Sequence, residues 1–128
     1  MKNLSVVALL AGGLLHLLPV SGVMGAGMLE HLYGIVPAGP DIAILLQHRA
    51  LLFGALGVLM LVAIALRPLR IAALSLALFS AAGFPLLAAG VGGYNAAIGR
   101  VVVADLFAVI LLSAGLVTEL RRASQPRH

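Results

Sequence analysis

The chain has 128 residues, of which 62% are hydrophobic and 9% are charged, and its formal net charge is +4. Soluble domains carry about a quarter charged residues, so this composition indicates a membrane protein with a single domain, residues 1–128. The sequence has no cysteine, which excludes disulfides and thiolate metal sites. Its basic residues do not line one face, which argues against nucleic acid as a partner and leaves the lipid bilayer.

Four long apolar segments predict an all-α protein, an up-down bundle of four transmembrane helices. A helix that crosses the bilayer needs about 20 residues, so the first segment must continue past Pro19. Pro40 suits the first turn of the second helix, Pro85 predicts a kink in the third, and Asn95 suits the N-cap of the fourth. The predicted helices cover about 4–24, 41–66, 69–89 and 95–120.

The segment 25–40 is the one long loop, and it lies on the outer side in this arrangement. Its stretch 28–33 is expected to form a helical turn at the membrane interface, where Tyr33 and Tyr94 suit the headgroup level. Residues 1–27 could instead be a signal peptide, which would leave three spans. The lack of a clean Ala-x-Ala cleavage site favours a retained first helix.

Basic residues gather on one side of the four predicted helices, and the loops on the other side hold none. Loops rich in Lys and Arg stay in the cytoplasm. The pattern therefore predicts that both termini are cytoplasmic and that the protein is a multi-pass protein of the inner (cytoplasmic) membrane. The residues that carry this pattern are Lys2, Arg67, Arg70, Arg121, Arg122 and Arg127.

Arg49 and Asp105 are charges set inside long apolar runs. Charge at membrane depth is costly, so it normally faces a protein interior, finds a partner and marks a functional site. At a rise of 1.5 Å per residue, both lie about 12–15 Å inward from the outer ends of their helices. We therefore expect Arg49 and Asp105 to contact each other directly or through one bound group.

Polar side chains gather in the outer half of the predicted bundle, and we expect no comparable cluster in the inner half. This distribution predicts an outward-facing pocket for a small polar or amphipathic molecule, in a binding or accessory protein rather than an enzyme. No catalytic or metal-ligating set is assigned, because the required motifs and ligand spacings are missing. The candidate ligand-binding residues are His16, Glu30, His31, His48, Arg49, Tyr94, Asn95, Arg100 and Asp105.

The same residues admit other interpretations. His48 with Arg49 and Asp105 would suit a subunit of a membrane redox or quinone-linked enzyme, and His16 with His48 would suit a bis-histidine haem site. An ion pair that only fixes helix register would suit a purely structural membrane partner. Pairs of small residues four positions apart are compatible with a homo-oligomer as well as with packing inside one chain. The sequence indicates no particular cofactor.

Several motifs spread over most of the chain carry a family resemblance. They include Leu15-His-Leu-Leu-Pro19, His48-Arg-Ala50, Gly93-Tyr-Asn-Ala-Ala-Ile98 and Ala104-Asp105. These motifs resemble a family of small, uncharacterised bacterial membrane proteins, which implies a helical bundle in the bacterial inner membrane and no particular activity. Some members are named phosphopantetheine adenylyltransferase, but the ATP-binding His-x-Gly-His-type motif of the soluble enzyme of that name does not occur here. The architecture is also similar to that of DoxX-like four-helix membrane proteins.

Overall fold

The computed structural model describes residues 3–125, and every regular element in that range is a helix. By length and composition, four stretches can cross a membrane: Leu4–Met24, Pro40–Ala65, Arg67–Val91 and Ala96–Ala123. The prediction of an all-α bundle with four candidate spans is therefore confirmed. In chain order the elements are α1 (Leu4–Leu17), the 3₁₀ helix η1 (Leu18–Met24), α2 (Ala26–Tyr33), α3 (Pro40–Ala65), the 3₁₀ helix η2 (Arg67–Leu69), α4 (Arg70–Val91) and α5 (Ala96–Ala123).

Proline and glycine set several of these boundaries. Pro19 lies in the first turn of η1, where the first span continues in the tighter 3₁₀ winding. Pro40 begins α3 after Gly39, whose φ of 100° favours glycine. Proline is tolerated at a helix start because its missing N–H would have no partner there. Pro85 does not end α4, which continues to Val91, past the predicted end.

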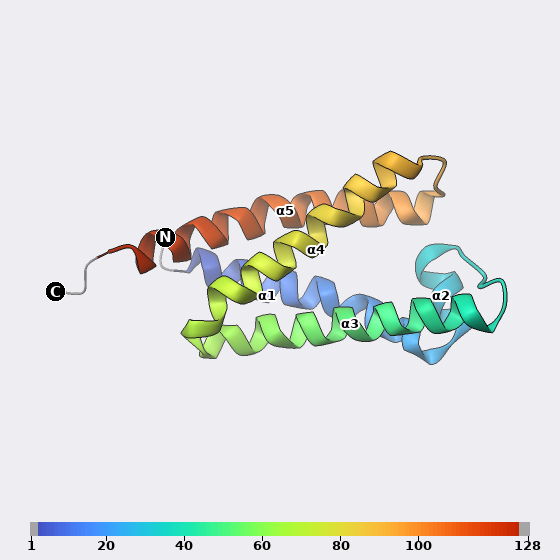
Figure 1. Cartoon of the computed structure of the whole chain (residues 1–128), viewed down its shortest axis with the longest axis horizontal. Helices are drawn as coiled ribbons and strands as arrows, with labels where there is room; N and C mark the ends of the chain where they lie inside the picture. The colour runs from blue at the N-terminus through green and yellow to red at the C-terminus, as the bar shows by residue number, and fades with distance from the viewer. Residues whose placement is uncertain (1–2, 126–128) are drawn as a thin grey trace.

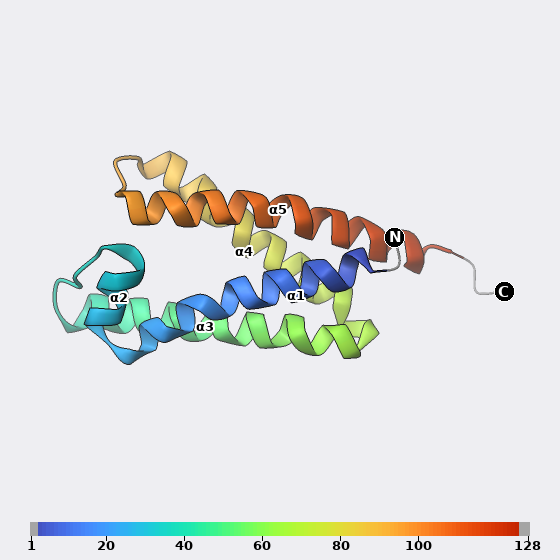
Figure 2. The same ribbon diagram turned by 180° about the vertical axis from the view of Figure 1, so that it is seen from behind.

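α1 lies between α3 and α5 on one side of the bundle, and α4 lies between them on the other (Figure 1, Figure 2). It packs against α3, α4 and α5, while α4 packs along α5. The beginning of α1, η2 and the end of α5 lie at one end of the bundle, which we call the inner end after the predicted orientation. α2 and the link between α4 and α5 lie at the opposite, outer end. Because α1 separates them, α3 and α5 are diagonal neighbours, as an up-down bundle predicts.

Small side chains dominate the core and let the helices approach closely. An added Cβ at Gly57 of α3 would lie 2.9 Å from the carbonyl oxygen of Gly13 in α1. An added Cβ at Gly115 of α5 would lie 2.7 Å from the Cβ of Ala8. Glycine is therefore required where α1 meets both partners. The buried core consists of Ala8, Leu9, Met60, Ala63, Ala73, Leu74, Ala77, Ala81, Ala108 and Leu112.

A polar network lies at the inner end, where the sequence predicted no comparable cluster, so that prediction was wrong. Glu119 accepts hydrogen bonds from Arg122 at 2.8 Å, from Arg70 at 3.4 Å and from the hydroxyl of Ser5. Arg70 also donates to two backbone carbonyl oxygens in the last turn of α3. Arg70 and Glu119 are 49 residues apart in the sequence, and only the packing of α4 on α5 brings them together.

The outer half of the bundle divides into two arms. Toward the outer end α4 and α5 lean together away from α3, whereas η1 and α2 stay with α3 (Figure 1). Asn95, at the start of α5, bridges the arms through a hydrogen bond from its Nδ2 to the carbonyl oxygen of Tyr33, at 2.9 Å. The side-chain oxygen of Asn95 accepts from the N–H of Ile98, so its prediction as the N-cap is confirmed. The space behind this bridge contains the candidate site.

Candidate functional site

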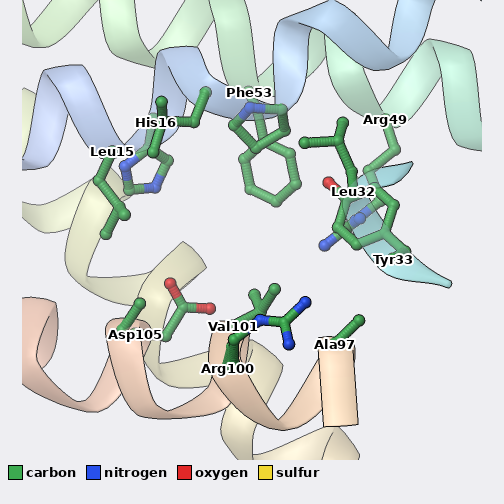
Figure 3. Close-up of a pocket in the computed structure, with 13 residues that line it drawn as sticks. Leu15, His16, Leu32, Tyr33, Arg49, Phe53, Ala97, Arg100, Val101 and Asp105 are labelled. Carbon is green, nitrogen blue, oxygen red and sulfur yellow. The ribbon is translucent and has the colours of Figure 1, made fainter. Parts of the chain in front are cut away.

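A pocket of about 220 Å³ lies between the two arms in the outer half. An apolar cavity of about 150 Å³ already accommodates a benzene molecule, so this space is large enough for a small organic group. α1, η1, α2 and α3 form one side of the pocket and α5 forms the other (Figure 3). Its polar and aromatic lining consists of His16, Tyr33, Arg49, Phe53, Arg100 and Asp105.

Three aromatic rings surround the guanidinium of Arg49. Its central carbon lies 4.6 Å from the ring centre of Phe53, which is one helical turn further along α3. The same carbon lies 5.3 Å from the ring centre of Tyr33 in α2 and 5.2 Å from that of Phe84 in α4. A cation over the face of an aromatic ring is attracted by the ring quadrupole, with about 0.5–2 kcal/mol per contact. These rings therefore hold the charge of Arg49 in place without neutralising it.

The charged groups of the pocket have hydrogen-bonding capacity that the protein does not use. Within residues 3–125, no group accepts a hydrogen bond from Arg49 or Arg100, and none donates one to Asp105. No buried side-chain nitrogen or oxygen in that range lacks a partner, so these atoms are not sealed inside the protein. A guanidinium carries five N–H donors and a carboxylate accepts through two oxygens. The pocket therefore presents strong donors and acceptors to whatever occupies it.

The donors and acceptors are separated along the pocket. Arg100 and Asp105 project from α5 into the space below Phe53, and they are about 7.5 Å apart along the helix axis (Figure 3). Arg100 lies toward the outer end of the pocket, across from Arg49, whereas Asp105 lies deeper, below His16. The pocket thus has a cationic outer part and an inner part that carries a carboxylate.

His16 adds a second acceptor to the inner part. It is 4% exposed, and its Nδ1 lies 2.8 Å from the carbonyl oxygen of Gly12. Because a carbonyl oxygen only accepts, Nδ1 must carry the proton, and Nε2 of the neutral ring is then an acceptor. The ring also packs against Phe53 with the two ring centres 5.7 Å apart. His16 and Asp105 therefore both offer acceptors to a donor group in the pocket.

Arg49 and Asp105 line the same pocket but do not touch. Within the described residues there is neither an ion pair nor a hydrogen bond between them, so the direct contact predicted from the sequence is not formed. Each lies nine residues after the first residue of its helix, Pro40 and Ala96. Because α3 begins further out than α5, Arg49 lies nearer the outer end than Asp105, so the predicted equal depth was wrong (Figure 1, Figure 3). The two helices are diagonal, so the pocket separates their side chains. Contact through a bound group stays a prediction.

The structure brings four of the predicted ligand-binding residues together and leaves five outside. His16, Arg49, Arg100 and Asp105 line the pocket. The other five do not line it and are exposed: Glu30, His31, His48, Tyr94 and Asn95. His48 is turned about 100° from Arg49 around α3, so it does not share the pocket with His16, as a bis-histidine haem site would require.

Sequence reasoning missed the aromatic residues around Arg49. Tyr33 was expected at the headgroup level, but it is 6% exposed and lines the pocket. Its ring is buried because α2 packs against η1 and α5 at the outer end of the pocket, and its level relative to the headgroups stays a prediction. Phe53 carried a usable signal, since residues four apart on a helix are neighbours and Phe53 follows Arg49 at this spacing. Phe84 carried none, because its approach depends on how α4 leans.

Within residues 3–125, no group of three His, Asp or Glu side chains could hold a metal ion. Comparisons with protein-family models, with curated proteins and with solved structures found no match for this chain. The family resemblance in the sequence motifs therefore stays a prediction, and the function must be inferred from the pocket.

Proposed function

We propose that this protein binds a small amphipathic molecule through a negatively charged group held by Arg49. The supporting observation is a guanidinium that three aromatic rings hold beside a pocket, with no hydrogen-bond acceptor among residues 3–125. A charge at membrane depth is costly unless it has a partner. Asp105 contributes an opposite charge in the same pocket but no hydrogen bond, and a bound anion would supply the acceptors that Arg49 lacks.

The charges of the lining favour a monoanion. Arg49 and Arg100 contribute two positive charges and Asp105 one negative charge, so the pocket carries a net charge of +1 when His16 is neutral. Guanidinium groups bind carboxylates and phosphates through paired, charge-assisted hydrogen bonds. A hydroxyl or N–H group of the same molecule would fit beside the acceptors of Asp105 and His16. The proposed ligand therefore combines an anionic group with a hydrogen-bond donor.

The proposal sets the protein in the inner membrane of a bacterium, with the pocket opening to the outer side. The distribution of basic residues supports this orientation, because Arg67, Arg70, Arg121 and Arg122 belong to the end of the bundle opposite the pocket. The ligand would then reach the pocket from outside the cell or from the outer leaflet. A binding or accessory role fits this arrangement.

Thermal unfolding of the purified protein in a neutral detergent tests the proposal with butyrate as the anionic probe and butylammonium as its matched cation. Ligand binding to the folded state raises the free energy of unfolding by RT ln(1 + [L]/Kd), about 1.4 kcal/mol at ten times Kd. We expect butyrate to stabilise the protein in a saturable way and butylammonium to have no such effect.

Two variants at Arg49 make the test specific. Arg49→Gln removes the charge and should abolish the stabilisation by butyrate, whereas Arg49→Lys keeps a charge without the paired donors and should retain a weaker response. Arg67→Gln is the matched control, because Arg67 lies exposed in η2 at the other end of the bundle. Equal stabilisation of the native protein and of Arg49→Gln would overturn the proposal.

A further inference from the structure

A second cavity, of about 210 Å³, lies between α1 and α5. Its lining is apolar and includes Ala11, Leu15, Ala104, Phe107, Ala108 and Leu111. Leu15 and Ala104 also line the first pocket, so the two spaces meet at these side chains. We call the second cavity the α1–α5 groove.

The α1–α5 groove opens sideways, toward the region where a bilayer would surround the bundle. Phe107 exposes 70% of its surface, and Ala11 is also exposed. From Ala104 to Leu111 the groove follows α5 inward for about 10 Å, at 1.5 Å per residue. An extended hydrocarbon chain could therefore enter the groove from the membrane without crossing the polar pocket.

From the outer end inward, the pocket and the groove present charged, polar and apolar groups in the same order as a lipid in the outer leaflet. Arg49 and Arg100 come first from the outer end, the acceptors of His16 and Asp105 follow, and the apolar groove continues inward. A lipid in that leaflet also has its charged head outward and its chain toward the membrane centre. This match in both order and direction indicates one elongated ligand rather than two separate ones.

Building on the proposed function, we propose that the ligand is a single-chain amphiphile, with its anionic head on Arg49 and Arg100 and its hydrocarbon chain in the α1–α5 groove. The opposite charges of head and guanidinium groups fix the outer end of the molecule. The hydrocarbon chain of the ligand would contact the alanine side chains of α1 and α5, whose small size creates the groove. The hydroxyl or N–H donor described above would lie near the head, beside Asp105.

A photoreactive decanoate with a diazirine on its terminal carbon tests where the chain lies. The native protein is reconstituted in bilayers of a zwitterionic lipid, illuminated with the probe, digested and mapped by mass spectrometry. We expect the label on groove residues such as Ala11, Phe107 and Leu111. Arg49→Gln should reduce this labelling by about tenfold or more, a change that corresponds to about 1.4 kcal/mol of lost binding free energy.

An Ala→Phe pair separates the groove from the rest of the lipid-facing surface. Ala11→Phe fills the groove and should reduce its labelling by about tenfold, equivalent to about 1.4 kcal/mol. Ala55→Phe makes the same change at an exposed position of α3 that lines neither cavity, and it should leave the labelling unchanged. Loss of labelling in both variants would contradict a chain site in the groove.

The two proposals fail in different ways. Label spread over exposed lipid-facing residues such as Phe79 and Leu86, without dependence on Arg49, would overturn the groove as the site of the chain. The proposed function would still stand if butyrate stabilised the native protein through Arg49. If butyrate gave no such stabilisation, the head site itself would be refuted, and with it the single-chain ligand.

Discussion

Asn95 and Tyr33 join the two arms of the bundle directly above the pocket. The side-chain Nδ2 of Asn95 donates to the carbonyl oxygen of Tyr33 at 2.9 Å, while its Oδ1 caps the first turn of α5. Tyr33 in turn places its ring against the guanidinium of Arg49. One side chain at a helix start therefore connects the outer loop, α5 and the cationic part of the pocket.

Asn95→Asp separates the two roles of this residue. The aspartate keeps an oxygen that can cap α5, but it has no N–H to donate to Tyr33. Its second oxygen would face the carbonyl oxygen of Tyr33, and both atoms are acceptors. We expect a loss of about 1–3 kcal/mol in the free energy of unfolding, the usual cost of leaving a partly buried polar group without its partner. Thermal unfolding in detergent measures it. Native stability in Asn95→Asp would show that the bridge contributes nothing.

Gly57→Ala tests the close approach of α1 and α3. The new methyl group would lie 2.9 Å from the carbonyl oxygen of Gly13 and 2.9 Å from Cγ of Leu17, so the helices must separate. Overpacking of this kind costs about 1–3 kcal/mol. Gly83→Ala is the control, because nothing lies within 4 Å of its added methyl group, and alanine there should stabilise α4 by up to about 1 kcal/mol. Equal stability of the two variants would refute the close contact.

Arg70→Lys tests the network at the inner end. Arg70 donates from Nε to the carbonyl oxygen of Ala63 at 3.1 Å and from Nη2 to that of Ile64 at 2.6 Å, and it pairs with Glu119. A lysine ammonium cannot reproduce this planar set of donors. The free energy of unfolding should fall by about 1–3 kcal/mol, since carbonyl groups at the end of α3 lose their partner.

The control for that change is Arg67→Lys, because Arg67 is exposed in the same turn. Its substitution should leave stability within about 0.5 kcal/mol of the native value. Chemical denaturation of both variants shows whether stability falls because the specific hydrogen bonds of Arg70 are lost or because any arginine is replaced by lysine. Equal effects would mean that the inner network is not specific to Arg70.

The predicted orientation can be measured with single cysteines, because the native chain has none. Ala38→Cys lies in the outer loop, and Ser124→Cys directly follows α5. With both termini in the cytoplasm, a membrane-impermeant maleimide added to intact bacterial spheroplasts should label Ala38→Cys and spare Ser124→Cys until the membrane is opened. The reverse pattern would turn the pocket toward the cytoplasm.

The helices and the charged residues of the pocket could be predicted because they depend on local patterns. Apolar length identifies the spans, and a charge such as Arg49 or Asp105 stands out inside them. Helix rise alone predicted an equal depth for these two residues, which was wrong because α3 begins further out than α5 (Figure 1). The absence of a direct bond between them could not be predicted. It depends on how far α4 and α5 lean away from α3 in the outer half of the bundle.

The remaining site residues depend on contacts between distant segments. Tyr33 enters the pocket only because α2 folds over it and Asn95 fixes its carbonyl group. Glu119 lies near the C-terminal end of a long apolar helix, where a charge usually reaches water. Its partners Ser5 and Arg70 come from two other helices. No local spacing relates these residues, so they could not be grouped before the packing of the helices was known.

The most direct test of the account follows the Nε–H group of Arg49 itself. Arginine side-chain signals of the isotope-labelled protein in detergent are recorded by NMR while butyrate is added, and Arg49→Lys assigns the signal by its disappearance. If Arg49 binds the anion, its Nε–H signal should move downfield and saturate, while that of Arg67 stays in place. An unmoved Arg49 signal, or equal unsaturable shifts of Arg49 and Arg67, would contradict the account.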